Sequence, residues 1–109
     1  MKLAGALAVA ALGAACGTSP VQACKDQGVA ECKKMWSCDA AVKLGSDEAS
    51  CITTYAGLCE GFAKEGKCEG GKTMDLGRVV ACTADIEKAS CDEYKSGTFR
   101  AANCEAACR

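Results

Sequence analysis

The sequence predicts an all-α fold, a small disulfide-stapled bundle of three longer helices and one or two short ones that follows an N-terminal signal peptide. Apolar residues recur at helical spacing over several segments. No segment shows the sustained alternation of β-branched residues that is typical of a strand. Eleven of the 109 residues are cysteine and only 5% are aromatic, so cross-links must supply stability that a core poor in large side chains cannot.

The first 15 residues have the pattern of an export signal. Met1-Lys2 is a short positive start, and residues 3–15 form an uncharged run of leucine, alanine, valine and glycine. This run is too short to span a bilayer but is typical of the apolar part of a signal peptide. Export also fits the cysteine content, because disulfides persist outside the cytosol.

Two cleavage sites follow this run. Gly13-Ala14-Ala15-Cys16 is similar to a bacterial lipobox, in which the cysteine becomes a lipidated N-terminus, although Gly13 stands where leucine is preferred. Val21-Gln22-Ala23 is a small-x-small site for ordinary signal peptidase, which would free a soluble protein that starts at Cys24. We favour lipidation at Cys16, because this cysteine directly follows the apolar run. The expected organisation is then residues 1–15 as signal peptide, 16–23 as lipidated cysteine and short tether, and 24–109 as cysteine-rich helical domain.

Three segments of the mature chain have long helical patterns. Residues 22–44 put Cys24, Cys32, Met35 and Cys38 on one broad face, interrupted by Gly28, and Gly45 is expected to end the helix. The second pattern begins at Ser46 with acids in its first turn, and Gly66 is its expected end. Its apolar positions are Cys51, Tyr55, Leu58, Cys59 and Phe62. The third covers residues 73–90, with Leu76, Val79, Cys82, Ile86 and Ala89 as its apolar stripe.

The remaining segments predict shorter elements. Ser90-Cys91-Asp92-Glu93 has the form of a capping box, so a short helix is expected to begin there and to end at Gly97. The tail from Phe99 predicts one further short helix. Residues 67–72, with the sequence KCEGGK, are expected to form a loop.

The ten cysteines from Cys24 to Cys108 are an even number, which favours five disulfides. Cysteines eight positions apart on one helix lie about 12 Å from each other, beyond the reach of a disulfide, so bridges must join different helices. An antiparallel hairpin of the first two helices predicts Cys38–Cys51, Cys32–Cys59 and Cys24–Cys68. The same logic predicts Cys91–Cys104 and Cys82–Cys108.

The composition gives little support for catalysis or for a cofactor. The chain has no histidine, which removes the commonest general base, and no C-x2-C pair of the kind that holds zinc or carries redox chemistry. The carboxylate pairs Asp47-Glu48, Asp85 with Glu87, and Asp92-Glu93 are explained by capping and solvation. With a net charge of −1 and no basic stripe, nucleic acid is not an expected partner. We therefore expect no enzyme activity, no metal and no cofactor.

Two aromatic residues are candidates for recognition. Trp36 is the only tryptophan, and Tyr94 precedes Lys95; either would be a binding anchor if exposed, but a core position is the more frequent one for such residues. Phe99-Arg100 is open to the same two interpretations. Among the loops, residues 64–72 around Cys68 are the best candidate for an exposed, disulfide-braced inhibitory loop.

The order of four segments, ACKDQ…AECKKMWSC, LGSDEASCITTYAGLC, VVACTADIEKASCDEY and ANCEAAC, resembles small cysteine-rich exported lipoproteins of the myxobacterial type. The likeness covers nearly all of the mature chain, and its strongest parts are the acidic start before Cys51 and the segment from Val79 to Cys91. It implies an exported helical disulfide domain. Most of these proteins have no assigned activity, so the resemblance carries over no catalytic residue.

These observations together predict an exported, lipid-anchored bacterial protein with a structural or protein-binding role. It would lie on the cell envelope as an outer membrane lipoprotein, with the membrane and an unidentified protein as its partners. The alternative is a freely secreted, disulfide-rich effector of the toxin or protease-inhibitor type.

Overall fold

The computed structural model describes residues 18–96 and 101–109, and this part of the chain is helical, as the sequence predicts. It has three longer helices, α2 (Pro20–Ser37), α3 (Glu48–Phe62) and α4 (Leu76–Lys88), and two short ones, α5 (Cys91–Ser96) and α6 (Ala102–Glu105). Two 3-10 turns, η1 (Ala63–Glu65) and η2 (Glu69–Gly71), lie between α3 and α4. Within the described ranges the only β pairing is two isolated bridges, Lys67 with Thr73 and Met74 with Cys108. None of the helices in these ranges has the length and apolar character that crossing a membrane requires.

Helix α2 begins earlier than the sequence analysis expects. Ser19 is the N-cap, its hydroxyl accepting a hydrogen bond from the Gln22 amide at 3.1 Å, and Pro20 occupies the first turn. Proline suits this position because its fixed φ matches the helix and its missing N–H would have no partner there. Residues 20–23, expected to belong to the tether, are therefore the first turn of the folded domain, and Ala23 is buried.

The same helix ends earlier than expected, at Ser37 rather than beyond Ala40. Asp39 adopts a left-handed conformation with φ of 52°, which stops the helix without a glycine. The Lys43 ammonium group then binds both the Asp39 carboxylate at 2.9 Å and the Ala40 carbonyl at 2.8 Å. The prediction that Gly45 ends this helix is wrong; Gly45 lies in the following loop, with φ of 87°.

The predicted start of α5 and the predicted stop at Gly66 are confirmed, whereas the cap of α3 is Asp47 and not Ser46, where the sequence pattern begins. Asp47 caps α3, and it forms a capping box with Ser50, whose hydroxyl accepts from the Asp47 amide. Gly66 ends the η1 turn that continues α3, with φ of 70°. The Ser90 and Glu93 capping box is also formed before α5, with both side chains hydrogen-bonded to the opposite backbone amide. The predicted end of this helix at Gly97 lies outside the described residues.

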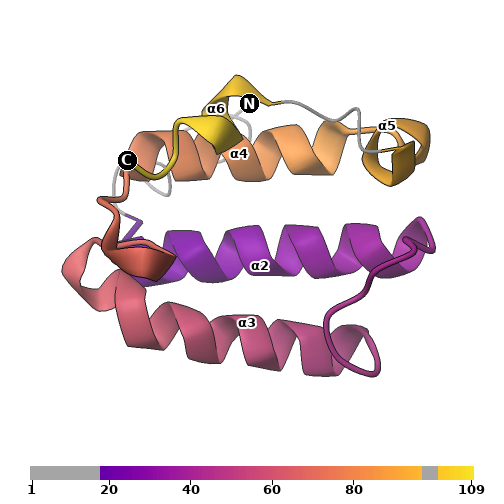
Figure 1. The fold of residues 1–109 in the computed structure, drawn as a ribbon, viewed down its shortest axis with the longest axis horizontal. Helices are drawn as coiled ribbons and strands as arrows, with labels where there is room; N and C mark the ends of the chain where they lie inside the picture. Colours follow the sequence, from indigo (N-terminus) through magenta and orange to yellow (C-terminus); the bar gives the residue numbers. More distant parts are fainter. Residues whose placement is uncertain (1–17, 97–100) are drawn as a thin grey trace, which may run out of the picture.

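The three longer helices lie side by side with α2 in the middle (Figure 1). Helix α3 runs antiparallel to α2, whereas α4 lies on the other side of α2 and runs in the same direction as it, with α6 packed against α4. The Lys34 ammonium group of α2 donates to the carbonyls of Glu87 and Ala89 at 3.2 and 2.7 Å, which places a cation at the negative end of α4. The core is small, as the composition predicts: its largest fully buried side chain is Ile86, and the next largest are those of four cysteines, Cys32, Cys51, Cys59 and Cys82.

All ten cysteines from Cys24 to Cys108 are in disulfides, but the five predicted pairings are wrong. The hairpin of α2 and α3 is joined by Cys24–Cys59 and Cys32–Cys51 instead of Cys24–Cys68, Cys32–Cys59 and Cys38–Cys51. In an antiparallel hairpin, the residue numbers of each bridged pair add up to a nearly constant sum, and both bridges satisfy this condition. The pairing is shifted by one cysteine along α2. The reason is that α2 ends at Ser37, so Cys38 is not part of the helix that faces α3.

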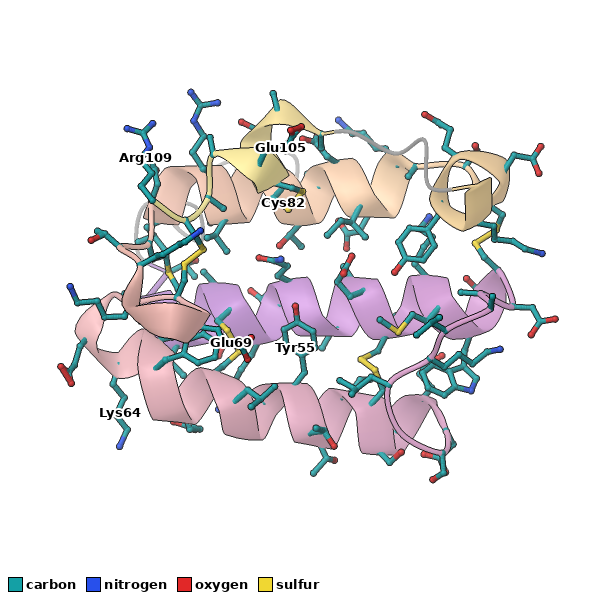
Figure 2. All side chains as sticks on the ribbon, in the orientation of Figure 1. Tyr55, Lys64, Glu69, Cys82, Glu105 and Arg109 are labelled. Carbon is teal, nitrogen blue, oxygen red and sulfur yellow. A yellow bond between two sulfur atoms is a disulfide. The ribbon has the colours of Figure 1, made fainter. Side chains whose placement is uncertain are left out.

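The other three bridges tie the second half of the chain to the hairpin and to itself. Cys38 forms a disulfide with Cys91, the first residue of α5. The predicted Cys82–Cys108 and Cys91–Cys104 are replaced by Cys82–Cys104, which holds α6 on α4, and by Cys68–Cys108. Cys24–Cys59, Cys32–Cys51 and Cys82–Cys104 join different helices, as the sequence predicts. Cys38–Cys91 joins the residue after α2 to α5, and Cys68–Cys108 joins two segments outside the helices (Figure 2).

Candidate functional site

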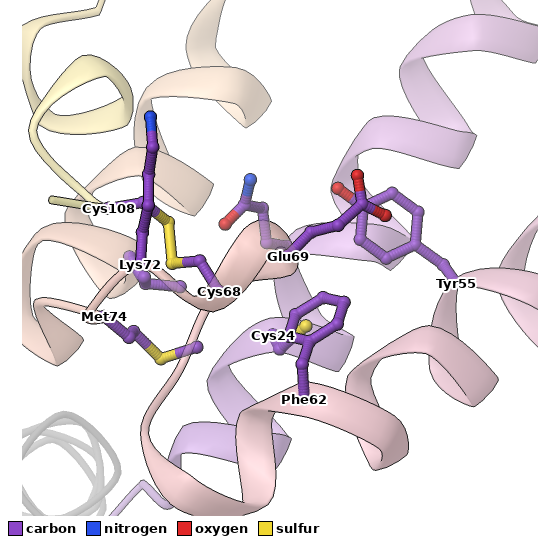
Figure 3. Close-up of a pocket in the computed structure, with 10 residues that line it drawn as sticks. Cys24, Tyr55, Phe62, Cys68, Glu69, Lys72, Met74 and Cys108 are labelled. Atoms are coloured by element: carbon purple, nitrogen blue, oxygen red, sulfur yellow. A yellow bond between two sulfur atoms is a disulfide. The ribbon is translucent and has the colours of Figure 1, made fainter.

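A pocket of about 310 Å³ lies where the first turns of α2, the last turns of α3, the η2 loop and the C-terminal segment meet (Figure 3). Its lining comes from positions spread over most of the described chain. The lining residues are Cys24, Gln27, Tyr55, Phe62, Cys68, Glu69, Lys72, Met74, Val79 and Cys108.

The floor of the pocket is apolar. Tyr55, Phe62 and Met74 pack against a buried cluster of Cys24, Cys59 and Ala63. Met74 also packs against a second buried cluster, which contains Val79. Met74 therefore joins the α2–α3 side of the pocket to the α4 side.

The wall formed by residues 66–75 is held by backbone hydrogen bonds and by a disulfide. The Cys68 amide donates to the Lys72 carbonyl at 2.7 Å, and the Met74 amide donates to the Gly66 carbonyl at 2.9 Å. The C-terminal segment lies along this wall, with the Asp75 amide donating to the Ala107 carbonyl at 2.8 Å. Cys68–Cys108 and Cys24–Cys59 close the two ends, so the pocket is preorganised by covalent bonds.

The two charged residues of the pocket, Glu69 and Lys72, are exposed and lie at its mouth. Figure 3 shows the Glu69 side chain extending toward Tyr55, while Lys72 lies on the side of the Cys68–Cys108 bridge. The pKa of Tyr55 is raised by burial and by the negative charges of Glu31 and Glu69. Its phenol therefore stays protonated at neutral pH and can donate or accept a hydrogen bond there.

The residues singled out from the sequence are distributed unevenly with respect to this pocket. The loop of residues 64–72 does contribute, through Cys68, Glu69 and Lys72. Trp36 is partly exposed at the far end of α2 and Tyr94 is partly buried on α5, and neither lines the pocket. Cys16, Phe99 and Arg100 lie outside the described residues.

The carboxylate pairs named in the sequence do not converge on a site. Asp47 caps α3, the Glu93 carboxylate accepts from the Ser90 amide in the capping box of α5, and Asp85 accepts a hydrogen bond from the Asn103 amide group at 3.0 Å. Over residues 18–96 and 101–109, no three cysteine or carboxylate side chains are grouped as metal ligands would be.

Sequence reasoning missed the pocket itself. The sequence pattern places Tyr55 and Phe62 on the apolar face of α3 and Lys72 in the candidate loop, but it indicates no role for Gln27 or Met74. No local pattern could have found these residues, because they meet only after α2, α3 and the C-terminal segment have packed together.

Comparison of the chain with protein-family models, with curated proteins and with solved structures finds no match in any of the three.

Proposed function

We propose that this chain is an exported, non-enzymatic binding domain held on the bacterial cell envelope by a lipid at Cys16. The observation that carries the proposal is the position of the α2 N-terminus between the two candidate cleavage sites. Helix α2 begins at Pro20 with Ser19 as its cap, after Cys16 and before Cys24.

Cleavage before Cys24 would remove parts of the fold that contribute to its stability. It would delete the Ser19 cap, which is worth about 1 kcal/mol in typical helices. It would also delete Ala23, which is buried in a cluster with Val79 and Ala107. Cleavage before Cys16 leaves all of these residues in place, which supports the lipobox over the second site.

Export is supported by the bridges. Five disulfides account for all ten cysteines from Cys24 onward, and such density is typical of proteins that fold in an oxidising compartment. The core has few large side chains, so without the bridges its burial alone would be a weak source of stability.

A binding role is supported by the chemistry of the pocket. Its floor is apolar and its mouth carries a few polar groups, as in small ligand sites. Its three cysteines are in disulfides and are not available as nucleophiles.

Lipid anchoring is tested by expressing the full chain in a Gram-negative host, with Cys16→Ser as the variant. We expect the wild-type protein to incorporate labelled palmitate, to fractionate with the outer membrane and to have an intact mass that starts at an acylated Cys16. Cys16→Ser should lose the label and the membrane fraction but keep all five disulfides, since Cys16 is not one of the ten paired cysteines.

A soluble species that begins at Cys24 would overturn the anchor and favour the freely secreted effector. For the inhibitor form of that alternative, the loop of residues 64–72 is less suitable than its sequence indicates. It is folded into the η1 and η2 turns, with Gly70 and Gly71 left-handed, and it does not present an extended segment.

A further inference from the structure

The mouth of the pocket carries two opposite charges that do not neutralise each other. Glu69 and Lys72 are three positions apart on one loop, yet the ion pairs among the described residues are Lys25–Glu60 and Lys43–Asp39. In Figure 3 the Glu69 side chain extends toward Tyr55, and the Lys72 side chain lies at the opposite side of the mouth. The pocket therefore has a negative end and a positive end.

The negative end is formed by Glu69, and the Tyr55 side chain lies beside it (Figure 3). The charge of Glu69 is one cause of the raised pKa of Tyr55, which agrees with the position of the two side chains in Figure 3. A cation placed beside Glu69 would be attracted by its carboxylate, and the Tyr55 oxygen could accept a hydrogen bond from it. Below this polar rim lie Phe62, Met74 and Val79, which are suited to an apolar group.

We propose that this pocket binds a short peptide with free termini and an apolar side chain. Its ammonium group would lie at Glu69 and Tyr55, its carboxylate at Lys72, and its side chain on Phe62 and Met74. The volume of about 310 Å³ is at the small end of ligand sites, which restricts the peptide to about two or three residues. This inference names the ligand class of the proposed binding role and rests on that role.

The geometry of the site is suited to binding without rearrangement. Cys24–Cys59 fixes α2 to α3 beneath the pocket, and Cys68–Cys108 fixes the η2 loop to the C-terminal segment. A site held in this way loses little conformational entropy on binding, so a small ligand can bind with useful affinity.

The test is calorimetric titration of the purified full-length mature protein, in mild detergent, with four ligands. Leu-Leu with free termini should bind. N-acetyl-Leu-Leu lacks the ammonium group, Leu-Leu-amide lacks the carboxylate, and Gly-Gly lacks the apolar side chains; each should bind at least about tenfold more weakly, the value of one charge-assisted hydrogen bond.

Variants assign each end of the peptide to its residue. Glu69→Gln should remove the preference for Leu-Leu over N-acetyl-Leu-Leu and keep the preference over Leu-Leu-amide. Lys72→Gln should remove the preference over Leu-Leu-amide and keep the preference over N-acetyl-Leu-Leu. Glu65→Gln and Lys64→Gln are the matched controls, because both residues are exposed on the same loop and neither lines the pocket. Figure 2 shows the Lys64 side chain directed away from the bundle.

Three results would overturn the proposal: no heat of binding for Leu-Leu up to about 10 mM, equal affinity for all four ligands, or full retention of the preferences in Glu69→Gln and Lys72→Gln. Unchanged disulfides and thermal unfolding in the variants show that they are folded. The result is independent of the anchoring test, since the cleavage point and the acyl group are read from mass and fractionation rather than from peptide binding.

Discussion

The side chain of Tyr55 on α3 packs directly against Gly28 of α2. A Cβ atom built on Gly28 would come within 2.6 Å of Tyr55 Cγ and 2.9 Å of Tyr55 Cβ, closer than carbon atoms approach in proteins. From the sequence, Gly28 is an interruption of a helical pattern. In the structure it is the residue that lets Tyr55 lie between the two helices and form one side of the pocket.

Replacing Gly28 with alanine should therefore destabilise the protein although alanine is the better helix former. We expect Gly28→Ala to lower the free energy of unfolding by about 1–3 kcal/mol, because overpacking outweighs the gain in helix propensity. Urea denaturation measures this loss.

Gly57→Ala on α3 is the matched control, since nothing lies within 4 Å of the Cβ that it would add. This variant should gain up to about 1 kcal/mol. A double-mutant cycle tests the contact directly. Gly28→Ala should cost less free energy of unfolding when it is introduced into Tyr55→Ala than when it is introduced into the wild-type protein. Equal effects of alanine at positions 28 and 57 would contradict the close packing of Tyr55.

The five bridges should differ in their accessibility to a reductant. Cys91 is exposed, whereas Cys32, Cys51, Cys59 and Cys82 are fully buried. Because thiol–disulfide exchange requires access to a sulfur atom, a mild reductant should open Cys38–Cys91 first. Alkylation followed by peptide mapping identifies the first pair to open, and mapping without reduction checks all five pairings.

Removal of that bridge by Cys38→Ala with Cys91→Ala should leave a folded but less stable protein. The bridge closes a loop of 53 positions, for which the chain-entropy account gives up to about 4 kcal/mol. Denaturant unfolding of the double variant measures the loss. The pairing is contradicted if mapping joins Cys38 to Cys51, as the hairpin pattern in the sequence predicts.

The sequence predicted the helices better than the bridges, for a physical reason. Helical spacing and caps are local, so the Gly66 end and the Ser90–Glu93 capping box could be predicted from a few neighbouring residues, and the start of α3 to within one residue. A disulfide register depends on where a helix ends. Helix α2 ends before Asp39, which is left-handed although it is not a glycine. Because of this end, Cys38 pairs with Cys91 of α5 and not with Cys51 of α3.

The start of α2 could have been found. Ser19-Pro20 has the form of a helix N-terminus, a cap followed by proline in the first turn, but its position after the apolar run led to its interpretation as a tether. The pocket could not have been found in this way. Glu69 and Lys72 were grouped correctly in one loop, whereas Gln27 and Met74 approach them only through the packing of remote segments.

Tyr94 should ionise at unusually high pH. Burial, with the negative charge of Glu31 as a second cause, raises its pKa to about 12 from an ordinary value of 10. A raised pKa means that the native state holds the proton more tightly than the unfolded state, so this contribution to stability is complete below pH 10 and is lost as the pH rises through about 12.

The tyrosinate absorbance of the folded protein measures this shift. The protein has two tyrosines, so the titrations of Tyr55→Phe and Tyr94→Phe separate their contributions. In denaturant both should titrate near 10. A Tyr94 that titrates at 10 in the folded protein would mean that α5 does not shield it.

Glu31 should make the protein less stable at neutral pH than it would be with an uncharged side chain. Burial raises the pKa of this carboxyl above its usual 4.5, and no ion pair among the described residues offsets the cost of its charge. The native state therefore binds the Glu31 proton more tightly, and its stability falls as the pH rises from 4.5 through the raised pKa.

Glu31→Gln should remove this fall and raise Tm by a few degrees at pH 7. The same variant should lower the pKa of Tyr94, because the charge of Glu31 contributes to its shift. Glu65→Gln, on the exposed loop, should do neither. A Glu31→Gln variant that loses stability at pH 7 would show instead that the carboxylate is stabilised by a partner.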